Sequence, residues 1–286
     1  MRVAYLGPPG TFSEEALLIA AGGAELEPDP RGTIYDAIEA VESGEADRGF
    51  VPFENSIEGT VRPTLDALAF DAERVRIVGE HDHPISLALI AARELDLDGI
   101  EAVVSHPQPL AQCARFLRER LPLAAVRTAA STAEAIGEVA EAEGPWAAIG
   151  SASAAEGYGC HVLCEGVEDV AGNVTRFVWL RREQPEAPPA EAGSASRTTL
   201  VFSELGEDHP GALVAALGEI SSRGVNMTRI ESRPRRTELG RYLFFVDLDG
   251  RAEEGAVAEA IEALRGQAEM VRVLGSYAVA GPSPLR

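Results

Sequence analysis

The chain contains no lysine, because all 25 of its basic residues are arginine. Without a lysine amine the protein cannot form a Schiff base with a substrate or with pyridoxal phosphate, and it cannot have the lysine of a P-loop. Any bound anion must therefore be held by arginine, by backbone N–H groups or by hydroxyl groups.

Cysteine and long apolar runs are also scarce. Three cysteines at Cys113, Cys160 and Cys164 are too few for a disulfide framework. The pair Cys160 and Cys164 lacks further zinc ligands, and so does the segment His81–His83, which we place on a short loop, so no metal site is predicted. The apolar run after Met1 is too short for a signal peptide, and no later run is long enough to span a membrane. We expect a cytoplasmic protein without membrane association.

Basic residues are much fewer than acidic residues. The chain has 46 acidic residues against 25 basic ones, a net charge of −21. A nucleic-acid-binding protein needs a basic surface, so this class of function is excluded. What the chain does have is length and apolar content: 286 residues, 45% of them hydrophobic, can bury one large core or two ordinary ones.

A linker divides the sequence. Residues 183–196 contain three prolines and three acidic residues but no large apolar residue, a composition typical of linkers. We therefore predict one domain at residues 1–182 and a second at residues 197–286.

The first domain is predicted to be α/β, because short apolar runs alternate with helical patterns. Thr11 and Glu14 fit a capping box at the start of the first helix. Strands are expected at Arg2–Leu6, Gly49–Phe53, Ile100–Val104 and Trp146–Gly150, and helices at 11–21, Thr33–Val41, Leu110–Arg120 and Ser131–Glu141.

A weak internal repeat lies within this domain. Sliding the chain by about 98 residues places Tyr35–Val41 on Ala133–Val139, and the strand before Pro52 on the strand before Gly150. The repeat favours two similar α/β lobes, with a ligand bound between them at the carboxyl ends of the strands.

The second domain reads β-α-β-β-α-β, the ferredoxin-like order. Leu213, Val214, Leu217 and Ile220 are expected to face inward from its first helix. The strands are predicted at Thr198–Phe202, Val225–Ser232, Tyr242–Asp247 and Met270–Leu274, and the helices at Gly211–Arg223 and Ala256–Leu264.

Polar segments follow the strands of the first domain, where sites in α/β folds collect. Taken singly, each is ordinary, and the glycine-rich turn lacks the third glycine of a dinucleotide-binding motif. The segments are Gly7–Ser13, Pro52–Gly59, Ser105–Cys113, Ala148–Ser151 and Asn173–Phe177.

Together these segments resemble, in order, the motif set of the prephenate dehydratase family. Two segments of the second domain, Asp208–Val214 and Glu231–Pro234, resemble the phenylalanine-binding motifs of that family's regulatory ACT domain. The resemblance implies a two-lobed, periplasmic-binding-protein-like catalytic domain followed by a ferredoxin-like βαββαβ ACT domain. It also implies a reaction: prephenate loses carbon dioxide and water to give phenylpyruvate, without a metal or redox cofactor.

This reaction needs a group at the departing hydroxyl and an anchor for a carboxylate. The resemblance assigns catalysis to Thr175, whose hydroxyl we expect to orient the departing group, because its unperturbed pKa makes it a poor acid. Glu54 or a water remains open as the proton donor, and Glu54 equally fits a role in holding its loop. Arg176 is expected to grip a carboxylate with two hydrogen bonds. Phe177 fits either a wall of the site or the core.

Neutral side chains complete the predicted site. Asn55, Ser105, Gln112 and Asn173 offer donors and acceptors for substrate oxygens, and Ser105 and Gln112 match family positions linked to activity. Thr11 and Ser13 lie at a helix N-terminus, where an anion can bind.

The resemblance also implies regulation. L-Phenylalanine is expected to bind at the interface of paired ACT domains, in a homodimer or homotetramer. The residues predicted to contact it are Gly211, Ala212, Leu213, Val214, Glu231 and Ser232. Two alternatives stay open: an arogenate dehydratase, which runs the same chemistry on the aminated substrate, and an amino-acid sensor without catalysis. The intact Thr175–Phe177 motif argues against the sensor.

Overall fold

The computed structural model describes residues 1–183, 195–205 and 210–279. The chain forms two compact units. One consists of Met1–Ala37, Phe50–Gly59 and Asp82–Phe177, and the other of Ile38–Gly49, Thr60–His81 and Val178–Arg286. Most of the predicted linker, residues 184–194, lies outside the described residues, so the domain boundaries stay a prediction.

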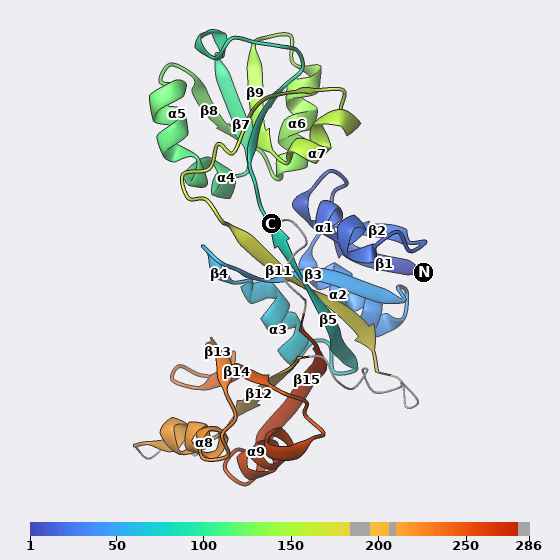
Figure 1. Ribbon diagram of the computed structural model, residues 1–286, viewed down its shortest axis with the longest axis vertical. Helices are drawn as coiled ribbons and strands as arrows, with labels where there is room; N and C mark the ends of the chain where they lie inside the picture. The colour runs from blue at the N-terminus through green and yellow to red at the C-terminus, as the bar shows by residue number, and fades with distance from the viewer. Residues whose placement is uncertain (184–194, 206–209, 280–286) are drawn as a thin grey trace. The chain divides into compact units, whose positions relative to one another are not determined.

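The first sheet has the strand order β2-β1-β3-β11-β5, with β4 paired to β3 (Figure 1). The middle strand β3 ends in the polar segment Pro52–Gly59. Its neighbour β11 begins in the polar segment Asn173–Phe177. The strands are β1 (Arg2–Leu6), β2 (Glu27–Arg31), β3 (Arg48–Asn55), β4 (Gly59–Thr60), β5 (Val75–Pro84) and β11 (Val174–Arg182).

The second sheet repeats the first. Its order is β10-β6-β9-β7-β8, so β8-β7-β9 corresponds to β2-β1-β3 strand for strand. This correspondence confirms the two-lobed prediction, and we call the parts built on the two sheets the first and second lobes. The strands are β6 (Ala88–Ala91), β7 (Ala102–Ser105), β8 (Ala125–Thr128), β9 (Trp146–Gly150) and β10 (His161–Glu165).

The helices of the two lobes are short. The predicted capping box at the first helix is wrong in detail: Thr11 makes no side-chain cap, and the Glu14 carboxylate instead accepts hydrogen bonds from Gly10 N and the Tyr5 hydroxyl, at 2.7 and 2.9 Å. The helices are α1 (Phe12–Ala21), α2 (Ile34–Ser43), α3 (Arg62–Phe70), η1 (Leu97–Gly99), α4 (Pro107–Gln112), α5 (Ala114–Arg120), α6 (Thr132–Glu141) and α7 (Ala152–Gly157).

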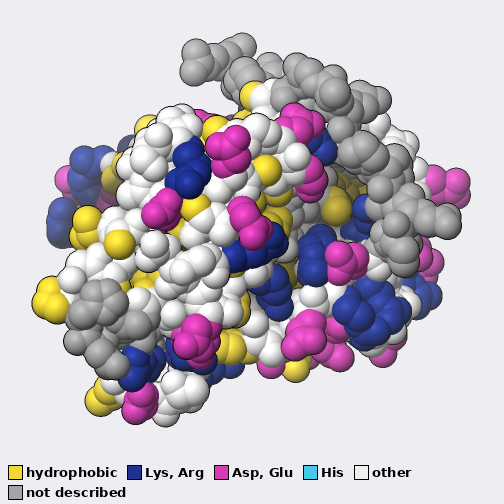
Figure 2. Space-filling model, turned by 90° about the horizontal axis from the view of Figure 1, so that it is seen from below, with side chains coloured by type: hydrophobic (Ala, Val, Ile, Leu, Met, Phe, Trp, Pro, Cys, Tyr) yellow, Lys and Arg dark blue, Asp and Glu magenta, His cyan; other side chains and the backbone are white. Residues whose placement is uncertain are grey.

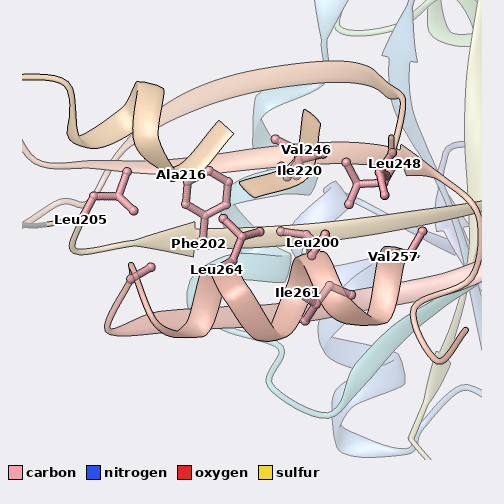
Figure 3. Close-up of a cluster of buried hydrophobic side chains, with 13 residues drawn as sticks. Leu200, Phe202, Leu205, Ala216, Ile220, Val246, Leu248, Val257, Ile261 and Leu264 are labelled. Atoms are coloured by element: carbon pink, nitrogen blue, oxygen red, sulfur yellow. The ribbon is translucent and has the colours of Figure 1, made fainter. Parts of the chain in front are cut away.

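The C-terminal sheet confirms the ferredoxin-like prediction, with the order β13-β14-β12-β15. Its core lies between the sheet and two helices, and Phe202, Ile220 and Leu264 are among its buried side chains (Figure 3). Val214, predicted to face inward, is 73% exposed, because it lies on the outer side of its helix. The elements are β12 (Ser196–Ser203), α8 (Ala212–Ser221), β13 (Met227–Pro234), β14 (Tyr242–Asp249), α9 (Gly255–Arg265) and β15 (Met270–Ala278).

The C-terminal sheet lies directly against β5 within the second compact unit. A Cβ atom on Gly275 would stand 2.1 Å from the carbonyl oxygen of Ile77, so only glycine allows this approach of β15. Nearby, the buried Glu80 carboxylate accepts a hydrogen bond of 2.5 Å from Arg197.

Arginine and acidic side chains lie interspersed across the face shown in Figure 2.

Candidate active site

Asn55 organises the centre of the site from the end of β3. Its amide nitrogen donates to Asn173 Oδ1 at 2.7 Å and to Thr175 Oγ1 at 2.9 Å. Its carbonyl oxygen accepts from the backbone N–H groups of Ile57 and Glu58, at 2.9 Å each. Since both ends of the amide are bonded, Asn55 is held in one orientation. The Thr175 oxygen accepts a bond here, so its own proton remains available to donate.

Gln112 joins this group from α4 in the second lobe. Its amide nitrogen donates to the Glu58 carboxylate at 3.1 Å, and its carbonyl oxygen accepts from Asn173 at 3.4 Å. The structure therefore brings together four predicted residues, Asn55, Gln112, Asn173 and Thr175. Glu58 was not among the predicted residues, although it lies within the predicted Pro52–Gly59 segment.

Arg176 belongs to a second set of contacts. Its guanidinium pairs with the Glu54 carboxylate at 2.7 Å and lies over the Phe53 ring, 5.0 Å from the centroid. The Arg176 side chain is 10% exposed and that of Glu54 is 38% exposed. A substrate carboxylate that binds Arg176 must share or displace Glu54.

Ser105 and Phe177 both make buried contacts within the first compact unit. Ser105 is fully buried and its hydroxyl donates to the carbonyl oxygen of Ile149 at 2.6 Å, which ties β7 to β9. Phe177 is buried and stacks on Phe50, with ring centroids 5.0 Å apart. Of the two roles that the sequence leaves open for Phe177, the structure favours the core.

The start of α1 is poorly suited to an anion. The Thr11 hydroxyl donates to the carbonyl oxygen of Leu6 at 3.4 Å, and Ser13 is buried. The first turn of the helix carries Glu14 and Glu15, whose carboxylates already interact with the positive end of the helix dipole. Their negative charge disfavours a substrate carboxylate at this point.

A polar cluster that the sequence does not predict surrounds Glu15. Its carboxylate accepts hydrogen bonds from Ser151 and from Ser153, the latter at 2.7 Å, and lies 3.3 Å from His83 Nε2. The segment His81–His83 belongs to β5 rather than to the predicted loop, and His83 is 2% exposed. Burial alone would raise the pKa of Glu15, but the hydrogen bonds from His83, Ser151 and Ser153 lower it to about 2.

The predicted effector residues divide between helix α8 and strand β13. Gly211 precedes α8 with a φ of 93°, in the left-handed region where glycine is favoured. Ala212 and Leu213 are half-buried, whereas Val214 is exposed. On β13, Glu231 is half-buried and Ser232 is exposed, since successive residues of a strand face opposite sides. Residues 208 and 209 of the same predicted motif lie outside the described residues.

Comparison with known families decides the identity of the fold. The family model "Prephenate dehydratase" matches residues 3–185. The chain belongs to the prephenate dehydratase family. A second family model, "ACT domain", matches residues 201–266.

Relatives of this prephenate dehydratase family member cover nearly its whole length. A prephenate dehydratase of Mycobacterium sp. (strain JLS) is 44% identical over 96% of this chain and 88% of its own. The crystal structure of prephenate dehydratase from Arthrobacter aurescens in complex with L-Phe is 42% identical, with a TM-score of 0.87 over 97% of this chain and 90% of that one. A structure described as GqqA, a novel type of quorum quenching acylase, is 32% identical, with a TM-score of 0.84 over 98% of both chains.

None of the helices in the described residues is long and apolar enough to cross a membrane.

Proposed function

We propose that this protein converts prephenate to phenylpyruvate, water and carbon dioxide, and that L-phenylalanine regulates it through the ACT domain. The observation that carries the proposal is the joined group of Asn55, Gln112, Asn173 and Thr175, in a chain of this family. Loss of the ring carboxylate as carbon dioxide pushes electrons toward the 4-hydroxyl, which takes a proton and leaves as water. The residues must therefore orient that hydroxyl and bind the remaining carboxylate.

Thr175 is the group that meets the departing hydroxyl in this proposal. Asn55 donates to the Thr175 oxygen at 2.9 Å, which directs the threonine proton away from Asn55 and toward a bound substrate. A hydrogen bond to the departing oxygen strengthens as negative charge develops on that oxygen, so it favours the transition state over the bound substrate. The proton itself comes from a water, or from Glu54 after this carboxylate has taken up a proton.

Arg176 is the proposed anchor of the side-chain carboxylate. Its planar guanidinium can bond two carboxylate oxygens at once. Glu54 holds this guanidinium at 2.7 Å, so the anchor is oriented in advance. A substrate carboxylate that takes over from Glu54 leaves the Glu54 carboxylate beside the site, where it can take up a proton and then deliver it to the departing hydroxyl.

Within the second compact unit, the ACT sheet contacts α3 and Thr60. On β13, Arg233 donates two hydrogen bonds to Asp66 of α3, at 2.9 and 2.8 Å, and Arg229 donates to Thr60 at 3.1 Å. Thr60 follows Glu58 by two residues in the chain. A shift of β13 on effector binding would therefore move the segment that carries Asn55 and Glu58. Such coupling is typically worth about 1–3 kcal/mol.

We further propose the finer features expected from the sequence: a cytoplasmic location, and pairing of ACT domains in a homodimer or homotetramer. Gly211 and the exposed Val214 at the start of α8 support an effector site there. Backbone N–H groups at this helix start can donate hydrogen bonds to a carboxylate, and Val214 offers apolar contact to a phenyl ring.

The test is turnover by the purified full-length protein. Prephenate should give phenylpyruvate, and added phenylalanine should change the rate. Arogenate and an acyl amide serve as parallel substrates, the second because of the related structure described as an acylase. Folded protein that turns over neither prephenate nor arogenate would refute the assignment. Arogenate as the better substrate would refute the prephenate preference alone.

A further inference from the structure

The start of α1 lies against the second lobe, within the first compact unit. The Phe12 ring packs against the apolar cluster of the second lobe that contains Leu89 and Ile149. The Tyr158 hydroxyl, which follows α7, donates to the carbonyl oxygen of Pro9 at 3.4 Å. The turn before α1 and the first residues of this helix follow β1 of the first lobe, yet they contact the second lobe.

Glu15 forms the charged part of this join. One of its oxygens accepts from both Ser151 and Ser153, whose hydroxyls lie 2.8 Å from each other at the end of β9 and the start of α7. Its other oxygen lies 3.3 Å from His83 Nε2, near the end of β5. A single carboxylate thus connects α1 and β5 with the β9–α7 turn. Its pKa of about 2 indicates that it stays ionised and bonded at neutral pH.

The β9–α7 turn is close in the chain to the second lobe's part of the active site. Ser151 follows Ile149 by two residues, and the Ile149 carbonyl accepts the hydroxyl of Ser105 at the end of β7. Beyond Ser105 the chain enters α4, which carries Gln112. A displacement of the turn would move this strand pair, and with it Gln112, relative to Asn55 and Thr175 of the first lobe.

We propose that Glu15 is a positioning residue, which aligns the second lobe's Gln112 with Asn55 and Thr175 through Ser151, Ser153 and His83. The inference rests on the proposed dehydratase function. Alignment matters because a misplacement of about 1 Å in a catalytic group can lower a rate by roughly 100-fold. Glu15 makes no contact with substrate in this proposal, so its loss should affect the reaction step more than binding.

Kinetics of four variants test the proposal. Glu15→Ala should lower kcat by roughly 10- to 100-fold with a change in KM of less than about threefold. Glu15→Gln keeps an oxygen that accepts from the serine hydroxyls and should recover part of that loss. Ser151→Ala should lower kcat by itself but add little to Glu15→Ala, because the two share one interaction. Glu138→Ala, an exposed glutamate on α6, is the matched control and should resemble wild type.

Hydrogen exchange gives a readout that needs no substrate. Glu15→Ala should speed backbone exchange at residues 151–157, whereas Glu138→Ala should not. A kcat of Glu15→Ala within twofold of that control, or unchanged exchange at 151–157, would overturn the positioning role. Wild-type protein without turnover would instead refute the proposed function, and with it the role in alignment, while the exchange result would still report whether Glu15 joins the lobes.

Discussion

Acid should weaken the folded protein partly through Glu15, and the size of this effect follows from its surroundings. The pKa of Glu15 falls from 4.5 to about 2 in the folded protein, because hydrogen bonds from His83, Ser151 and Ser153 outweigh the cost of burial. Since the folded pKa is the lower one, the ionised carboxylate stabilises the fold above about pH 4.5, and this contribution disappears as the pH falls toward 2. The shift corresponds to about 3 kcal/mol at neutral pH, of which about 2 kcal/mol is lost by about pH 3.

Urea unfolding at a series of pH values between about 7 and 3 measures this contribution. Wild type and the control Glu138→Gln should lose stability along parallel curves, which include the background from other carboxylates. Glu15→Gln has no proton to gain at this position, so its curve should be flatter by about 2 kcal/mol over the same range. If the free energy of unfolding of Glu15→Gln falls in parallel with that of wild type, the carboxylate is not held by these donors and the reasoning is refuted.

Four further outcomes follow from the site and from the ACT contacts. Thr175→Val should lower kcat by roughly 100-fold or more with little change in KM, whereas Thr175→Ser should retain most turnover; a valine variant with half the wild-type kcat would remove Thr175 from the mechanism. Arg176→Lys should raise KM for prephenate, since an ammonium cannot bond two carboxylate oxygens side by side, and an unchanged KM would contradict the anchor. Gly211→Ala should weaken the response to phenylalanine without changing basal turnover, because its φ of 93° suits glycine; titration of the rate with phenylalanine measures this. Asp66→Asn should likewise reduce the phenylalanine response by weakening the bonds from Arg233, and an unaltered response would remove this pair from the coupling.

The two-lobed architecture could be predicted from the sequence because both lobes contain the same order of an apolar helix pattern followed by a strand. Helix α2 and helix α6 share their apolar spacing, and the strands that follow them end in polar motifs. The corresponding orders β2-β1-β3 and β8-β7-β9 show that this local similarity reflects the same packing. The motif positions Asn55, Asn173 and Thr175 could also be selected, since each lies beside the end of a strand.

Strands with atypical composition were missed. β2 reads Glu-Pro-Asp-Pro-Arg and is mostly exposed. It has neither an alternation of apolar and polar residues nor residues of high β propensity, so the sequence does not indicate a strand. It pairs at the outer end of its sheet next to β1, where proline is tolerated because one side needs no ladder hydrogen bonds. β5 contains His81–His83, whose polar residues favour a loop when the sequence is considered alone.

The Glu15 cluster could not be predicted, because it depends on contacts between distant parts of the chain. Glu15 and Ser151 are 136 residues apart, and a glutamate in the first turn of a helix has an ordinary local role at its positive end. His83 likewise has no neighbour in sequence that predicts its partner. Only the packing of α1 against the second lobe brings the carboxylate, the imidazole and the hydroxyls together.

Because the chain has no lysine, the cationic contacts between the ACT sheet and α3 are all made by arginine. Arg233 bonds both oxygens of Asp66, and Arg236 adds a third bond at 3.0 Å. Asp66 would have a raised pKa from burial alone, yet these guanidinium groups lower it. A planar guanidinium fixes the direction of its partner as well as the distance, whereas an ammonium acts as a point charge. We therefore expect the directional bonds to Asp66 to couple the orientation of β13 to that of α3 more tightly than a lysine ion pair would. The arginine-only composition is therefore suited to the proposed coupling between the ACT sheet and α3.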